Sequence, residues 1–120
     1  MNWNLDKKRP ICPQICEQIA VMIAKNDLKP GDRLMSVREV ALEAQVTPNT
    51  VQKSFEILEQ QGIIYSRRGS GWYVSEGNEI AKTVRDEFIR QKTGEYINDM
   101  LSLGLTRDEI EKNVKEFSNE

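Results

Sequence analysis

The chain contains no histidine and only two cysteines among its 120 residues. Without histidine it lacks the commonest general base and the commonest metal ligand, and two thiols are too few for a zinc finger. The sequence also lacks the GxGxxG, GxxxxGK[ST] and GxSxG motifs. Its carboxylates are plentiful but fall on solvated helical faces, with no pair placed for acid–base work. We therefore expect no enzyme activity, no cofactor and no metal site.

The two cysteines, Cys12 and Cys16, lie four residues apart in a helical pattern. A disulfide within one helix is geometrically poor, and two thiols do not form the disulfide framework of a secreted domain. We expect both residues to be reduced and at least half-buried. A redox role for the pair is the alternative.

Long apolar runs are also missing. No stretch approaches the ~20 residues that span a bilayer, and the N-terminus lacks the charged-then-apolar pattern of a signal peptide. These absences predict a cytoplasmic protein. The length of 120 residues suits one compact domain with an appendage.

The net charge of −2 is divided unevenly along the chain. Residues 1–75 hold ten Lys/Arg against eight Asp/Glu, whereas residues 76–120 hold seven against eleven. The first part is therefore mildly basic and the second acidic. Because the distribution of charge matters more than its sum, we expect any contact with an anionic partner to come from the first part.

The run SVREVALEAQVTPNTVQKSFEILEQQG predicts two short helices joined by a tight turn. Ser36 and Glu39 have the spacing of a capping box at the start of the first helix. Thr47 is an N-cap for the second, Pro48 suits its first helical position, and Gly62 suits its end. The second helix has an apolar face and an amide-rich outer face, which suits the major groove of DNA: Val51, Phe55 and Leu58 against Asn49, Gln52 and Lys53.

Other elements surround this pair. An amphipathic helix is expected from Pro10 or Pro13 to Asn26-Asp27, followed by a turn and a very short strand at residues 33–35. Residues 63–66 and 72–75 predict a β-hairpin with the polar tip Arg67–Gly71. The fold class is mainly α with a small β-hairpin (α+β), in the order of a winged helix-turn-helix. We assign residues 1–76 to this domain and 77–120 to a helical tail.

The tail predicts a long helix over residues 78–103 and a second one that begins with the capping box Thr106–Glu109. Both helices are sparse in apolar residues, and helices of this kind are usually stabilised by packing. About 45 residues cannot enclose much core, so we expect contacts between subunits of a homodimer. The candidate dimerisation residues are Trp3, Ile80, Val84, Phe88, Ile97, Met100, Leu101, Ile110, Val114 and Phe117.

The segments LKPGDRL, SVREVA, VTPNTVQKSFEILEQQGII and RRGSGWYV, in this order and spacing, resemble the GntR family of bacterial transcription regulators. The resemblance covers roughly residues 10–75, and the two-helix tail is similar to that of the YtrA subfamily. In two positions the chain departs from the family pattern. Met35 stands where proline is usual, which predicts a looser start of the helix capped by Ser36, and Cys12 stands where an aromatic is common, which alters packing.

A recognition helix places its N-terminal residues against base edges. The amides of Asn49 and Gln52 suit adenine, and Lys53 suits phosphate or guanine. The resemblance adds Arg38 as a phosphate contact, and the glycine at the hairpin tip allows a close approach to the minor groove. The full predicted DNA interface is Ser36, Arg38, Thr47, Pro48, Asn49, Thr50, Gln52, Lys53, Arg67, Arg68, Gly69 and Ser70.

These features predict a sequence-specific repressor that binds double-stranded DNA as a homodimer on an inverted-repeat operator. The YtrA-like resemblance implies control of an adjacent transporter operon. The alternative is a winged helix that binds proteins and not DNA. A small-molecule effector in a groove between the helical tails stays open, with no residues assigned to it.

Overall fold

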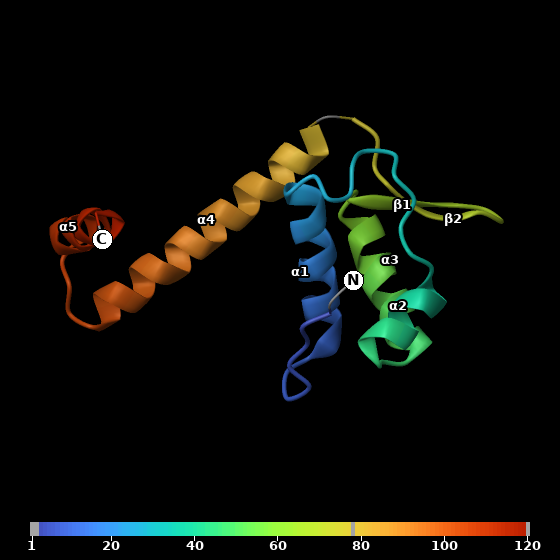
Figure 1. Cartoon of the computed structure of the whole chain (residues 1–120), viewed down its shortest axis with the longest axis horizontal. Helices are drawn as coiled ribbons and strands as arrows, with labels where there is room; N and C mark the ends of the chain where they lie inside the picture. Colours follow the sequence, from blue (N-terminus) through green and yellow to red (C-terminus); the bar gives the residue numbers. More distant parts are fainter. Residues whose placement is uncertain (1–2, 78, 120) are drawn as a thin grey trace. The chain divides into compact units, whose positions relative to one another are not determined.

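The computed structural model describes residues 3–77 and 79–119. The chain divides into two compact units, Met1–Arg85 and Asp86–Glu120. The first unit holds the elements of the winged helix-turn-helix (Figure 1): α1 (Ile11–Ala24), α2 (Val37–Ala44), α3 (Pro48–Gln60), β1 (Ile64–Arg67), β2 (Gly71–Val74) and the beginning of α4 (Glu79–Ser102). The second unit holds the rest of α4 and α5 (Arg107–Ser118). The predicted fold class is confirmed.

Two predicted boundaries fall near the start of α4. The first residue predicted for the tail helix, Asn78, lies outside the described residues. The division between domain and tail after residue 76 stays a prediction, since the first turns of α4 belong to the first compact unit. Ala81 from these turns packs against the core of that unit.

The core of the first unit lies between α1, α2, α3 and the inner face of the hairpin. Phe55 of α3 is fully buried at its centre, and its ring meets Trp72 of β2 edge-on, with centroids 5.5 Å apart. Apolar residues at helical spacing on α1 and α3 supply most of the cluster, as their periodicity predicts. The buried members are Ile15, Ile19, Ile23, Leu34, Val40, Ala41, Val51, Phe55, Leu58, Ile64 and Val74.

Helix α1 packs along α3, and its two cysteines face that contact. The Cys12 Sγ donates to the Thr50 carbonyl at 3.4 Å, and the Cys16 Sγ donates to the Ser54 carbonyl at 3.3 Å. The buried Ser54 hydroxyl also donates to the Thr50 carbonyl, at 2.9 Å. Both thiols are free and half-buried, as predicted.

The predicted caps of α2 and α3 are confirmed, whereas α1 ends at Ala24, before the predicted Asn26-Asp27. Ser36 accepts from the Glu39 amide at 3.0 Å while Glu39 accepts from the Ser36 amide at 3.3 Å, which completes the capping box of α2. Thr47 caps α3 with Pro48 in the first turn, and Gly62 follows α3 with φ +76°. Between the two helices the backbone turns at Gln45, which has φ +57°.

The predicted strand at residues 33–35 is reduced to a single bridge. Arg33 pairs with Tyr73 of β2, and the Leu34 amide donates to the Trp72 carbonyl at 2.8 Å. The pairing stops there because Ser36 already caps α2. β1 and β2 form the predicted hairpin, antiparallel, with Ile64 opposite Val74 and Tyr65 opposite Tyr73.

The second unit contains the C-terminal part of α4 and all of α5. The predicted capping box is present: Thr106 accepts from the Glu109 amide at 3.2 Å and Glu109 accepts from the Thr106 amide at 3.0 Å. Ile110 of α5 is buried, and the Asn113 side chain donates to the Tyr96 hydroxyl of α4 at 3.5 Å. Within residues 3–77 and 79–119, no helix is long and apolar enough to cross a membrane.

Replacement of the α2 cap tests the local basis of this fold. We expect Ser36→Ala to lower the free energy of unfolding by about 1 kcal/mol, because the Glu39 amide loses its acceptor. Ser118→Ala, which alters an exposed serine at the end of α5, should change it by less than about 0.5 kcal/mol. Urea unfolding followed by circular dichroism measures both; equal effects of the two variants would contradict the role of the cap.

The half-buried thiol of Cys16 predicts that the stability of the fold depends on pH. Burial, together with a smaller effect of the nearby Cys12, raises the pKa of Cys16 from 9.0 to about 11. The folded state therefore holds this proton more tightly than the unfolded chain, so its contribution to stability is complete below pH 9.0 and is lost as the pH approaches about 11. We expect the melting temperature to fall more in this range for the wild type than for Cys16→Ser. Parallel decline of both proteins would contradict the shift.

Candidate nucleic-acid interface

Helix α3 presents the predicted polar face at its N-terminal end. Asn49 and Lys53 are exposed, whereas Val51 and Phe55 between and beyond them are fully buried. Because Val51 and Phe55 anchor the helix from behind, its first two turns are held at the surface with their polar side chains outward. This is the arrangement that a recognition helix requires.

Three other predicted residues, the N-cap Thr47 and two residues of α3, already have partners in the chain. The Thr47 hydroxyl accepts from the Thr50 amide at 3.3 Å and lies 2.9 Å from the Thr50 hydroxyl. The half-buried Gln52 donates from its amide nitrogen to Glu56 at 3.2 Å. A bidentate contact of Gln52 with adenine would therefore require the Glu56 contact to break. Pro48 is exposed and contributes backbone shape.

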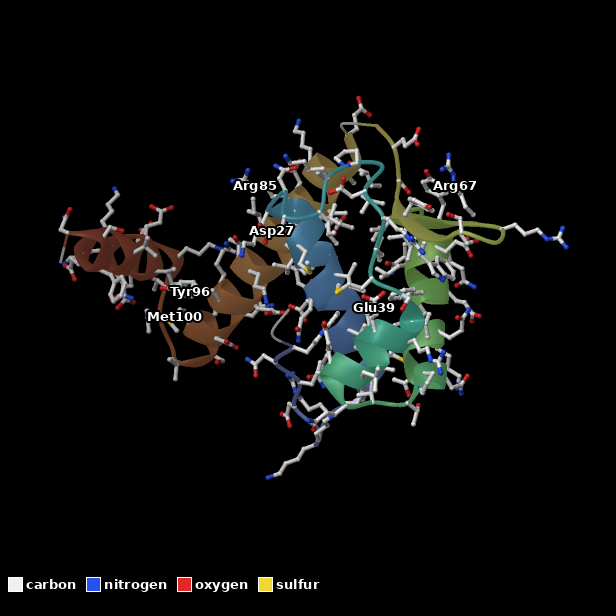
Figure 2. The ribbon with its side chains drawn as sticks, turned by 45° about the vertical axis from the view of Figure 1, so that its right-hand side comes forward. Asp27, Glu39, Arg67, Arg85, Tyr96 and Met100 are labelled. Atoms are coloured by element: carbon white, nitrogen blue, oxygen red, sulfur yellow. The ribbon has the colours of Figure 1, made fainter. Side chains whose placement is uncertain are left out.

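The start of α2 supplies the second part of the surface. Arg38 is exposed in the first turn of this helix. Ser36 is half-buried and its hydroxyl is used by the cap, so its placement favours a structural role. Figure 2 shows Glu39, the other half of the capping box, on the same helix. At the far end of α2, Lys7 donates to the Ala44 and Gln45 carbonyls, at 3.2 and 2.9 Å, and stabilises the turn into α3.

The hairpin tip is a tight turn with two arginines. The Ser70 amide donates to the Arg67 carbonyl at 3.0 Å, and Gly69 within the turn has φ +75°. This backbone conformation favours glycine. The tip residues Arg67, Arg68, Gly69 and Ser70 are all exposed, and Figure 2 shows Arg67 on the hairpin. The Arg67 guanidinium lies over the Tyr73 ring, 5.1 Å from its centroid.

A third arginine, Arg33, contacts the hairpin, and the sequence pattern did not reveal this contact. Arg33 lies 37 residues before Ser70, and its Nη2 donates to the Ser70 carbonyl at 2.8 Å. The backbone bridge to Tyr73 places Arg33 beside the hairpin. A basic residue at the start of a predicted short strand gives no sign of this contact, because the pairing of residues 33 and 73 that creates it is a tertiary one.

The predicted dimerisation residues fall into two groups. Val84 and Ile110 are almost fully buried within the chain itself, and Trp3 packs against the core of the first unit, with its Nε1 donating to Glu43 at 3.3 Å. The others stay partly or largely exposed: Ile80, Phe88, Ile97, Met100, Leu101, Val114 and Phe117. Ile89 and Leu103 are also exposed, at 53% and 71%, and the spacing pattern missed both.

Comparison with known proteins supports the family resemblance that the sequence motifs indicate. Residues 13–74 match the family described as "Bacterial regulatory proteins, gntR family". The chain is 36% identical to the uncharacterized HTH-type transcriptional regulator YhcF of Bacillus subtilis over 98% of both proteins. It is 38% identical to the HTH-type transcriptional repressor YtrA of the same organism, over 91% of this chain and 85% of YtrA.

Solved structures support the same family. A GntR family transcriptional regulator from Listeria monocytogenes superposes with a TM-score of 0.87 and 34% identity, over 93% of this chain and 98% of that one. AraR(DBD) in complex with operator ORX1 matches 59% of this chain and 87% of its own, with a TM-score of 0.55 and 26% identity. These relatives are transcription regulators and not enzymes. The chain belongs to the GntR family of bacterial transcription regulators, with YtrA and YhcF among its relatives.

Proposed function

We propose that this regulator is a repressor that binds an inverted-repeat operator as a homodimer. The observation that carries the proposal is the exposed N-terminal end of α3, with Asn49 and Lys53 outward over a fully buried Val51 and Phe55. The hairpin beside α3 supplies a second contact surface with Arg67 and Arg68 (Figure 1). The match to AraR(DBD), which was solved in complex with operator ORX1, supports DNA binding by this domain.

The contacts divide into base readers and phosphate binders. Asn49 and Gln52 carry amides that suit the N6 and N7 atoms of adenine, and each bidentate pair discriminates by about 1–3 kcal/mol. Arg38 binds phosphate, Lys53 binds phosphate or guanine, and the arginines of the hairpin enter the adjacent minor groove. Ser36, Thr47 and Thr50 contribute through the backbone geometry that their caps stabilise.

A dimer follows from the small number of phosphate contacts that one such domain makes. Few contacts give modest and salt-dependent affinity, and two copies about a two-fold axis add theirs on half-sites one helical turn apart or a multiple of it. The partly exposed apolar residues of α4 and α5 are the surface for this association. Phe117 of α5 is 74% exposed and Leu103, in the turn between α4 and α5, is 71% exposed, and association would remove both from water.

Repression of an adjacent transporter operon is what the YtrA-like resemblance implies for this chain. A cytoplasmic location stays a prediction from the sequence. A small-molecule effector between the helical tails stays open, with no residues assigned to it.

Deletion of the gene for this protein should raise transcription of the neighbouring genes, measured by RNA sequencing. Unchanged transcript levels would argue against repression of those genes.

Titration of duplex DNA tests the assigned contacts. A preferred duplex is first selected from a random pool. Asn49→Ala should then relax the preference at one base position by about 1–3 kcal/mol. Arg38→Ala should weaken all duplexes together and reduce the salt slope by about one.

Lys25→Ala serves as the control, since Lys25 follows the C-terminal end of α1 and pairs with Asp27 at 3.5 Å. It should leave both affinity and salt slope nearly unchanged. Absence of duplex binding by the wild type even at low salt would contradict DNA recognition and favour a protein-binding winged helix.

The association state tests the tail surface. We expect sedimentation equilibrium at tens of micromolar to give twice the chain mass of 13.8 kDa. Phe117→Lys should shift the protein toward monomer without lowering its melting temperature as a monomer, because the side chain is exposed. Leu42→Lys, a change at a 78% exposed leucine of α2, is the matched control and should leave the dimer intact. A monomeric wild type would overturn the proposal.

A further inference from the structure

We propose that Arg33 is a positioning residue for DNA recognition, because it holds the hairpin tip in its binding conformation before DNA arrives. The inference rests on the proposed binding of DNA by the hairpin. It assigns a role to a residue that lies outside both the recognition helix and the tip. The ligand is the backbone of double-stranded DNA beside the tip residues Arg67–Ser70.

The first observation is a hydrogen bond from Arg33 to Ser70 of the hairpin tip. The Arg33 Nη2 donates to the Ser70 carbonyl at 2.8 Å, and Ser70 in turn donates its amide to the Arg67 carbonyl at 3.0 Å. The Arg33 backbone is fixed independently by its bridge to Tyr73 and by the following bond from the Leu34 amide to the Trp72 carbonyl, 2.8 Å. The guanidinium therefore reaches the tip from a fixed base.

The side chain of Tyr73 also contacts Ser70. Its hydroxyl forms a short hydrogen bond with the Ser70 hydroxyl. Its ring stacks on Tyr65, with centroids 5.7 Å apart, and carries the Arg67 guanidinium on its face. The hydrogen bond with Ser70 lowers the pKa of Tyr73, and the charges of Arg33 and Arg67 lower it further. Ser70 is thus held through both its carbonyl and its hydroxyl.

The backbone beside Ser70 is matched to this guanidinium. Gly71 has φ +133°, and a Cβ at this position would lie 3.3 Å from the Arg33 Nε and 3.4 Å from its Nη2. A side chain here would press on the arginine, whereas a Cβ at Gly69 or Gly77 would meet nothing within 4 Å. Glycine at position 71 therefore allows the close approach of Arg33 as well as the unusual backbone angle.

Such a restraint matters because a hairpin with strands of four residues is marginal by itself. Ordering a loop on binding costs free energy, and a loop that is already ordered avoids this cost. Arg33 also adds a positive charge near DNA, so the experiment has to separate position from charge. Lysine keeps the charge but lacks the planar guanidinium that reaches Ser70.

The first measurement uses the free protein and needs no DNA. Arg33→Lys should speed hydrogen exchange of the Ser70 amide several-fold with little change in melting temperature. Tyr73→Phe, which keeps the ring stack but removes the hydroxyl contact, should do the same. Unchanged exchange in both variants would overturn the proposal, whatever the outcome of DNA binding.

The second measurement is a double-mutant cycle on the selected duplex. In the otherwise wild-type protein, Arg33→Lys should weaken DNA binding about three- to tenfold. In a protein that already carries Arg68→Ala and so lacks one tip contact, the same change should weaken binding by less than about twofold. Non-additivity of this kind shows that Arg33 acts through the tip. Additive losses, or full retention of affinity by Arg33→Lys, would overturn the positioning role. Failure of the wild type to bind any duplex would instead refute the proposed function.

Discussion

The contact between Phe55 and Trp72 joins the two parts of the domain that the function needs. Phe55 is fully buried in α3, and the Trp72 ring meets it edge-on from β2. Aromatic pairs of this geometry stabilise by about 0.5–1.5 kcal/mol beyond the area that they bury. Because one ring belongs to the helix and the other to the hairpin, the polar face of α3 and the hairpin tip keep a fixed relation to each other.

This relation determines how the other elements contribute. Helix α1 supports α3 from behind, and the thiols of Cys12 and Cys16 donate to its carbonyls. Helix α2 is tied at both ends, by the Ser36 capping box and by Lys7 on its last carbonyls. The surface proposed to meet DNA is thus made of short elements, each held by specific contacts within the first unit.

Much of this was predictable from local patterns. Capping residues such as Ser36 and Thr106 and the apolar spacing of α3 act within a few residues of chain, so the helices and their ends could be predicted. The contact of Arg33 with Ser70 could not, since it joins positions 37 residues apart through an exposed arginine. The strand expected at residues 33–35 became a single bridge because the cap of α2 begins at Ser36.

Exposure in the tail shows the same limit. Periodicity identified Phe117 and Val114, which are exposed, but also Val84 and Ile110, which are buried within the chain. Spacing along a helix indicates a face, and only the packing around that face decides which of its residues stay accessible.

The sequence by itself determined the family, the order of elements and the polar residues at the start of α3, because caps, glycines and apolar spacing are local properties of the chain. The tertiary structure decided which of those side chains already have partners, as Gln52 has in Glu56. It also decided that Arg33 belongs to the hairpin tip. Contacts of this kind depend on which surfaces the buried core brings together, and no local pattern encodes that.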